Sequence, residues 1–194
     1  MSTPSTKEKI VAIADELFYQ RGFDHTSFAD IAGEVAISRG NFYHHFKTKD
    51  QILEAVIELR AENTQAMIRE WEEASTSPKE RIKSYITILY RNKDKIKKHG
   101  CPVGTLTSEL AKLNHDAQGL AGRIFTQFDD WLQMQFKELG FTEEAELLSQ
   151  HVLARSQGIA TLYNTFRNDT FLDKEVSLLL NWLEDTCSAT NSHQ

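Results

Sequence analysis

Apolar residues recur every three or four positions along most of this chain, and few helix-breaking residues interrupt the pattern. Residues 7–21 show it first, with Ile10, either Ile13 or Ala14, Leu17 and Phe18 on one side of a helix of about 3.6 residues per turn. The 194 residues include three prolines and nine glycines, and the alternating β-branched runs that strands favour are rare. The pattern therefore predicts an all-α protein of about nine helices.

Caps and breakers indicate where these helices begin and end. Ser27 with Asp30, Ser38 and Thr48 are placed as N-caps, and Pro78 suits a first helical turn. The expected helices cover residues 7–21, 27–35, 38–46, a long segment from 48–51 onward, a segment from 78 onward, 105–113, 116–139, 142–167 and 173–188. The first three helices form one expected domain, residues 1–48, and the others form a second, residues 49–194.

The composition excludes several classes of protein. The first residues contain no signal-like segment, and no apolar run approaches the roughly 18 residues of a membrane helix. We therefore expect a cytoplasmic protein with no membrane partner. The two cysteines, Cys101 and Cys187, cannot form a disulfide framework. Catalytic motifs and His or Cys clusters at metal-ligand spacing are missing from the sequence. We therefore expect neither an enzyme nor a cofactor.

The segment SRGNFYHHFKTKD, residues 38–50, mixes aromatic rings, histidines and cations. At about 100° per residue, Phe42 and Phe46 fall on one side of a helix and can pack on the preceding helix, while Asn41 and His44 fall on the other side. Two short helices joined by a tight turn, the second with a polar outer face, are typical of a helix-turn-helix, whose second helix enters the DNA major groove. The net charge of −6 does not exclude DNA, because binding depends on local potential.

Each exposed group of this segment suits one kind of DNA contact. Arg39 and Asn41 can hydrogen-bond base edges, and Gly40 allows the helix to approach the duplex closely. The residues suited to phosphate contacts are Thr26, Tyr43, His44 and Lys49. Ser27 and Ser38, at the starts of the two helices, complete the candidate DNA-binding set.

Residues 8–57 resemble the DNA-binding domain of the TetR family of transcriptional regulators. The positions that carry the resemblance are Phe18, Gly22, Phe23, Thr26, Ile31, Ala32, Val35, Ser38, Gly40, Phe42, Tyr43, Phe46, Lys49 and Leu53. The resemblance implies a homodimeric repressor that binds double-stranded, palindromic operator DNA and leaves it when a small-molecule effector binds. A helical adaptor or architectural protein with a degenerate DNA-binding domain remains an alternative.

A dimer also follows from the DNA hypothesis. One short recognition helix reads only a few base pairs, so useful specificity requires two copies on a two-fold symmetric site. In the TetR family the last two helices commonly form a four-helix dimer interface. By this resemblance the candidate interface residues are Leu148, Val152, Ile159, Leu162, Phe166, Leu179, Trp182 and Leu183. The same apolar stripes could instead be the core of a single chain.

The middle helices carry many aromatic residues, a composition most often found in an ordinary core. In the TetR family such helices also line a pocket for an apolar or aromatic effector. The candidate pocket residues are Trp71, Tyr85, Tyr90, Glu109, Phe125, Phe128 and Trp131.

Cys101 lies in the turn GCPVG, just before an expected helix and two residues after His99. A neighbouring histidine and a helix N-terminus can lower the pKa of a thiol. The GCPVG segment also resembles a TetR subgroup with a cysteine at this position, some members of which respond to electrophiles or oxidants. A redox or electrophile sensor is therefore a second hypothesis, and an inert thiol in a tight turn is its alternative.

Overall fold

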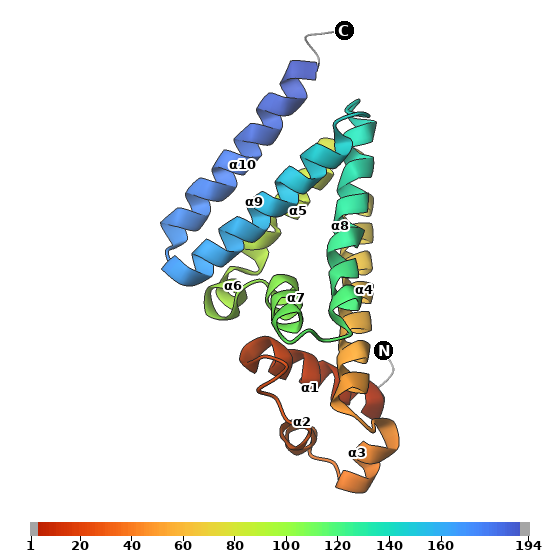
Figure 1. Ribbon diagram of the computed structural model, residues 1–194. Coiled ribbons are helices and arrows are strands. Elements are labelled where there is room, and N and C mark those ends of the chain that lie inside the picture. Colours follow the sequence, from red (N-terminus) through yellow and green to blue (C-terminus); the bar gives the residue numbers. More distant parts are fainter. Residues whose placement is uncertain (1–3, 191–194) are drawn as a thin grey trace. The chain divides into compact units, whose positions relative to one another are not determined.

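A computed structural model of the chain describes residues 4–190, and this range contains ten α-helices and no strand (Figure 1). The helices are α1 (Thr6–Arg21), α2 (Phe28–Val35), α3 (Arg39–His45), α4 (Lys49–Ala74), α5 (Pro78–Arg91), α6 (Lys93–His99), α7 (Pro102–Lys112), α8 (Gln118–Glu138), α9 (Ala145–Phe166) and α10 (Asp169–Thr190). The all-α prediction is confirmed. Within residues 4–190, no helix combines the length and the apolar character that a membrane crossing requires.

Four helices differ clearly from the expected ones, and of these α9 begins at Ala145 rather than at 142. α6 is the additional helix, because the chain turns at Asn92 and continues as a separate short helix. α7 begins at Pro102 rather than at 105, since a proline is well suited to the first helical turn. α10 begins at Asp169 rather than at 173, because the Asn168 side chain accepts hydrogen bonds from the backbone N–H groups of Thr170 and Phe171 at 2.9 and 3.3 Å.

The helices form two compact units. Unit 1 contains Met1–Thr64 with Pro102–Ile124, and unit 2 contains Gln65–Cys101 with Phe125–Gln194. The first half of α4 and the whole of α7 therefore pack with the three N-terminal helices. The expected division at 48/49 is a division by function, which these packing units do not test, and it stays a prediction.

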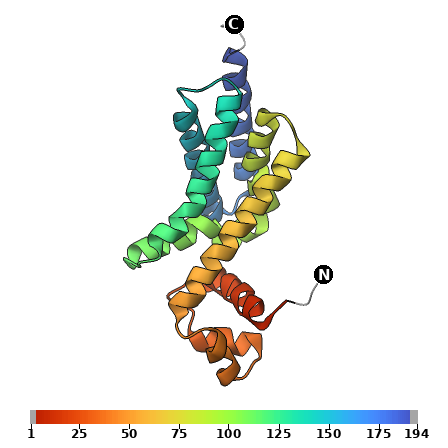
Figure 2. The same ribbon diagram turned by 90° about the vertical axis from the view of Figure 1, so that its right-hand side faces the viewer.

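Unit 1 is built around α1, which packs against α2 and α7. Ile10, Ala14 and Phe18 form the buried face of α1, and Ile31 of α2 and Leu53 of α4 are also fully buried. Figure 2 shows α1, α2 and α3 grouped around the first turns of α4. The three short helices thus share one core with the start of the long helix.

An ion pair inside unit 1 was not foreseen from the sequence. Arg60 of α4 is only 8% exposed. Its Nε donates to Asp15 Oδ1 of α1 at 2.6 Å, and its Nη1 donates to the Pro102 carbonyl at the start of α7 at 2.5 Å. One guanidinium therefore joins three helices.

In unit 2, α9 and α10 lie side by side and antiparallel, joined by a short turn (Figure 1). α5 packs on both helices, and α6 packs on α9. Lys79 and Lys83 of α5 form ion pairs with Glu184 of α10 at 2.9 and 2.6 Å, and these hydrogen bonds, Lys83 first, lower the pKa of Glu184.

We predict that Arg60→Met lowers the free energy of unfolding by about 2 kcal/mol. The change leaves Asp15 without its partner and the Pro102 carbonyl without a donor, and the loss is below that of a fully buried pair because Asp15 is partly exposed. Thermal or urea unfolding measures it. Arg69→Met is the control, because Arg69 is exposed on the same helix. Equal unfolding midpoints for the two variants would contradict the assigned role.

Candidate nucleic-acid interface

Aromatic burial holds α3 in place. Phe42 is fully buried and Phe46 is 3% exposed, as their spacing predicted. Phe28 of α2 packs edge-to-face on Phe42, with ring centroids 4.7 Å apart, and lies 5.1 Å from the ring of Tyr43. The orientation of α3 on α2 is thereby set by three rings.

The opposite face of α3 is open to solvent. Arg39, Gly40, Asn41 and His44 are exposed, and Tyr43 is 48% exposed. Apart from its chain neighbours and its own helix backbone, a Cβ added to Gly40 would meet no heavy atom of the described residues within 4 Å, so no other segment covers this position. The outer face of α3 therefore presents donors, acceptors and one ring at a place that can approach a duplex closely.

The hydroxyls of Ser27 and Ser38 serve as helix caps. Ser38 Oγ accepts a hydrogen bond from the Asn41 N–H at 3.3 Å. Ser27 Oγ accepts from the Asp30 N–H at 3.1 Å, while the Ser27 hydroxyl and N–H donate to the Asp30 carboxylate at 2.6 and 2.8 Å. These bonds, the hydroxyl first, hold the pKa of Asp30 below its usual value. Both serines are exposed, and a DNA contact by either one stays a prediction.

Thr26 requires a correction. Its side chain is fully buried, and its hydroxyl donates to the Gly22 carbonyl at 2.7 Å. The side chain therefore stabilises the turn between α1 and α2 and is not available to a phosphate. A hydroxyl residue just before a helix has the same sequence signature in both roles, so only the packing separates them.

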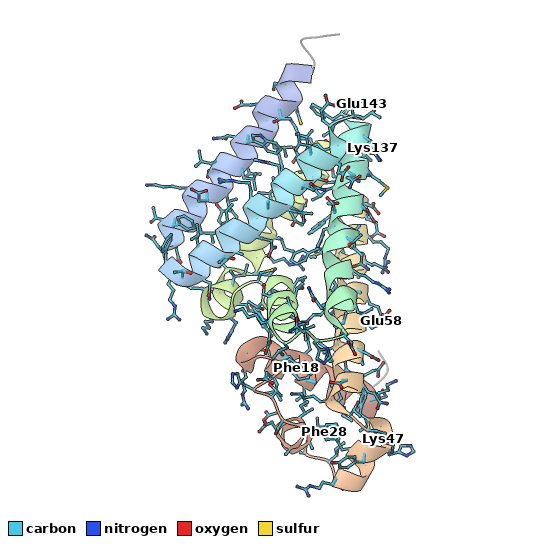
Figure 3. The ribbon with its side chains drawn as sticks, viewed as in Figure 1. Phe18, Phe28, Lys47, Glu58, Lys137 and Glu143 are labelled. Atoms are coloured by element: carbon cyan, nitrogen blue, oxygen red, sulfur yellow. The ribbon has the colours of Figure 1, made fainter. Side chains whose placement is uncertain are left out.

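Two lysines stand at the junction of α3 and α4. Lys49 Nζ donates to the Phe23 carbonyl at 3.0 Å and lies 4.1 Å from the centroid of the Phe23 ring. Lys47 is exposed, and its Nζ donates to the Tyr43 carbonyl at the end of α3. Figure 3 shows Lys47 in the same part of unit 1 as Phe28. Lys47 is one of the cations of residues 38–50 but was not among the expected phosphate contacts, although its charge could have indicated one.

The expected pocket residues separate into three groups. Trp71, Tyr85, Phe128 and Trp131 are buried in unit 2 and pack against one another, with ring centroids 5.1 to 6.4 Å apart. Trp131 Nε1 donates to Glu72 Oε1 at 3.0 Å, and burial raises the pKa of Tyr85 well above its usual value. These four rings fill the interior, as an ordinary core does.

Phe125 and Tyr90 have other surroundings. Phe125 is half-buried and borders an open groove of about 390 Å³ between α8 and α9. The groove is lined by Phe125, Thr126, Asp129, Gln150, Leu153, Ala154 and Gln157. Tyr90 is also half-buried, and its hydroxyl donates to the Asp173 carbonyl of α10 at 3.5 Å.

Glu109 does not belong with this set. Its carboxylate, in unit 1, accepts hydrogen bonds from the backbone N–H groups of Phe23 and Asp24 at 2.9 and 3.0 Å. The expectation that Glu109 is a polar group of the pocket is therefore corrected. Its partners lie more than eighty residues earlier in the chain, a distance that no local pattern indicates.

The expected dimer residues also divide by helix face. Val152, Ile159, Leu179 and Leu183 are buried in the chain's own core, so the intramolecular alternative is correct for these four. Leu162 and Phe166 are 43% and 56% exposed, and Leu148 and Trp182 are half-buried. Two exposed leucines were missed, Leu147 at 70% and Leu178 at 56%. Helical periodicity located the apolar stripes, but it did not show which stripe faces inward.

Cys101 lies directly before α7 and is half-buried. Burial first, and then the proximity of Cys101, raise the pKa of Tyr85, so the Cys101 thiol lies near a buried hydroxyl. Cys187 is half-buried in α10, and burial raises the pKa of its thiol. A sensor role for Cys101 stays a prediction.

The chain is similar to known transcriptional regulators. Residues 10–56 match the family model described as "Bacterial regulatory proteins, tetR family". The chain is 28% identical to an uncharacterized HTH-type transcriptional regulator in the lacX 3' region of Lactococcus lactis subsp. lactis, over 90% of this chain and 91% of that protein. It is 24% identical to the HTH-type transcriptional repressor DhaR of Mycobacterium sp. (strain GP1), over 92% of each. The crystal structure of a TetR transcriptional regulator from Legionella pneumophila has a TM-score of 0.82 and 25% identity, covering 96% of this chain and 99% of that one.

The open face of α3 yields a prediction that separates two kinds of contact. Tyr43→Phe removes the hydroxyl but keeps the ring beside Phe28. We therefore expect it to lower the affinity for all DNA sequences alike, by about threefold to tenfold. Asn41→Ala should instead relax the preference at one position of each half-site, by about 1–3 kcal/mol of discrimination. Binding to an operator and to single-base variants measures both. A relaxed preference in Tyr43→Phe, or a uniform loss in Asn41→Ala, would contradict these roles.

Proposed function

Since the chain belongs to the TetR family of DNA-binding transcriptional regulators, we propose that it is a repressor released from its operator by a small molecule. Two protomers bind a palindromic site, each through α3. The observation that carries this proposal is the two-sided character of α3, with Phe42 buried and Arg39, Gly40 and Asn41 exposed. The relatives with which it was compared are transcriptional regulators, one of them a repressor.

The DNA contacts in this proposal are divided by chemistry. Arg39 and Asn41 read base edges, because both residues are exposed in the first turn of α3. The groups assigned to phosphates are Tyr43, His44, Lys47 and Lys49. The chain carries a net charge of −6, and its cations here are few: Arg39, Lys47 and Lys49. They favour local contact with the duplex over broad attraction along it.

The proposed dimer surface is the exposed side of α9 and α10. Leu147, Leu162, Phe166 and Leu178 expose 43% to 70% of their surface there. Trp182 of α10 lies with its ring 4.4 Å from that of His151 on α9, so the exposed strip spans both helices. Large apolar side chains exposed on neighbouring helices typically mark a contact with another protein, and a second copy of this chain satisfies the two-fold symmetry of an operator.

The proposed effector is a small apolar or aromatic molecule that binds unit 2. The groove bordered by Phe125 and Leu153 supports this part of the proposal, because it has the volume of a small ligand site and an apolar wall. Asp129 lies at its edge, held by the Ser149 hydroxyl at 2.6 Å and the Gln133 amide at 3.0 Å, so a polar group of the effector meets a fixed acceptor.

The central test is binding to the DNA upstream of the chain's own gene. We expect a sequence-selective complex with two protomers per site and an affinity that falls steeply with salt. Phe166→Glu should weaken both protomer association and operator binding at least tenfold, because it places a charge in an apolar contact. Sedimentation and gel shifts measure the two effects.

Leu113→Glu is the matched control, since Leu113 is 42% exposed and belongs to unit 1, not to the proposed dimer surface of unit 2. The absence of any sequence-selective complex for the unaltered protein would refute the regulator. A normal dimer of Phe166→Glu would refute only the assigned surface.

The effector site has its own prediction. The experiment screens small aromatic compounds for release of the protein from its operator. For a compound that is active, we expect Phe125→Ala to raise the concentration needed for release about tenfold, because the site loses one apolar wall. Met134→Ala is the control, because Met134 is 51% exposed on the same helix and does not line the groove. Equal dose dependence of the two variants would place the effector elsewhere.

A further inference from the structure

The turn between α1 and α2 is held by a residue from a distant part of the chain. The two oxygens of Glu109 on α7 accept hydrogen bonds from successive backbone N–H groups, Oε2 from Phe23 at 2.9 Å and Oε1 from Asp24 at 3.0 Å. A carboxylate has two acceptor oxygens for these two donors, whereas an amide has one. The chemistry of this contact therefore favours glutamate over glutamine.

The surroundings of Glu109 are built for close approach. Leu106 and Leu110 on the same helix are buried, where α7 packs on α1, so the neighbouring Glu109 is carried to the end of α1. Gly22 ends α1 with a φ of +88°, and a Cβ at this position would lie 2.8 Å from Glu109 Oε1. The backbone conformation at residue 22 thus requires glycine, and a side chain there would displace the Glu109 carboxylate.

The other side of the same turn holds Lys49. The Phe23 carbonyl accepts a hydrogen bond from Lys49 Nζ at 3.0 Å, and the ammonium lies over the Phe23 ring at 4.1 Å. The His115 ring packs edge-on against Phe23 at 5.1 Å, and its Nε2 lies 3.3 Å from Asp50 Oδ1. Phe23, 4% exposed, is therefore held by its N–H, its carbonyl and its ring.

We infer that Glu109 is a positioning residue for DNA binding, which holds the turn at Phe23 and through it the ammonium of Lys49. The inference rests on the proposed function, in which Lys49 contacts a phosphate. Glu109 itself touches no DNA in this arrangement. Its carboxylate fixes the peptide at Phe23, and that peptide fixes the position of a cation at the N-terminus of α4, where the helix dipole also favours an anion.

The test is the salt dependence of operator binding. A lost phosphate contact lowers the slope of log affinity against log salt by about 1. We expect Glu109→Gln and Lys49→Gln each to lower the slope by this amount and to weaken binding about tenfold, the loss typical of one charge-assisted hydrogen bond. The double variant should lose little more than either single variant, because both act on one contact.

Two further variants separate positioning from charge and from stability. Glu58→Gln removes the same charge from an exposed site on α4 (Figure 3) and should leave the slope unchanged. Glu109→Asp keeps the charge but shortens the side chain, so it should lower the slope as Glu109→Gln does. A purely structural role would lower the unfolding temperature without changing the slope of the folded protein.

The outcomes distinguish this inference from the proposed function. If the unaltered protein binds its operator and both Glu109 variants keep its slope, or if the double variant loses the sum of the single losses, the inference is overturned and the proposed function stands. If the unaltered protein shows no selective binding, the proposed function fails first.

Discussion

The edge-to-face contact between Phe28 and Phe42 is the interaction on which the candidate DNA-binding surface depends. With a centroid separation of 4.7 Å, it anchors one side of a helix of only seven residues, which could not persist alone in water. Burying that side forces the opposite side outward, so the exposed positions of Arg39, Gly40 and Asn41 follow from the burial of Phe42. The apolar contact thereby determines where the polar contacts can be made.

The turn before α2 depends on hydrogen bonds from distant residues. Its backbone donors at Phe23 and Asp24 lie outside any helix, and an unpaired N–H in a packed turn is costly. Glu109 satisfies both of them, while the Phe23 carbonyl receives Lys49. A segment from the middle of the chain therefore completes the N-terminal helices, which explains why α7 and the first half of α4 belong to their unit.

Unit 2 shows how helices with two apolar sides are used. In α9 and α10, one side packs inward through residues such as Val152 and Leu183, and another exposes Leu147, Phe166 and Leu178. The inward side stabilises the unit, and the outward side is the proposed dimer surface. Likewise, Trp71, Tyr85, Phe128 and Trp131 pack against one another, whereas Phe125, at the margin, borders an open groove.

The sequence by itself determined the all-α class, nearly all of the helices and the division of α3 into Phe42 and Asn41 sides, because helical periodicity and capping act over a few residues. Only the tertiary structure decided that Thr26 is buried, that Glu109 caps a turn, and that Arg60 pairs with Asp15. Each of these depends on which helices meet, and a contact across tens of residues leaves no local pattern from which a single sequence could predict it.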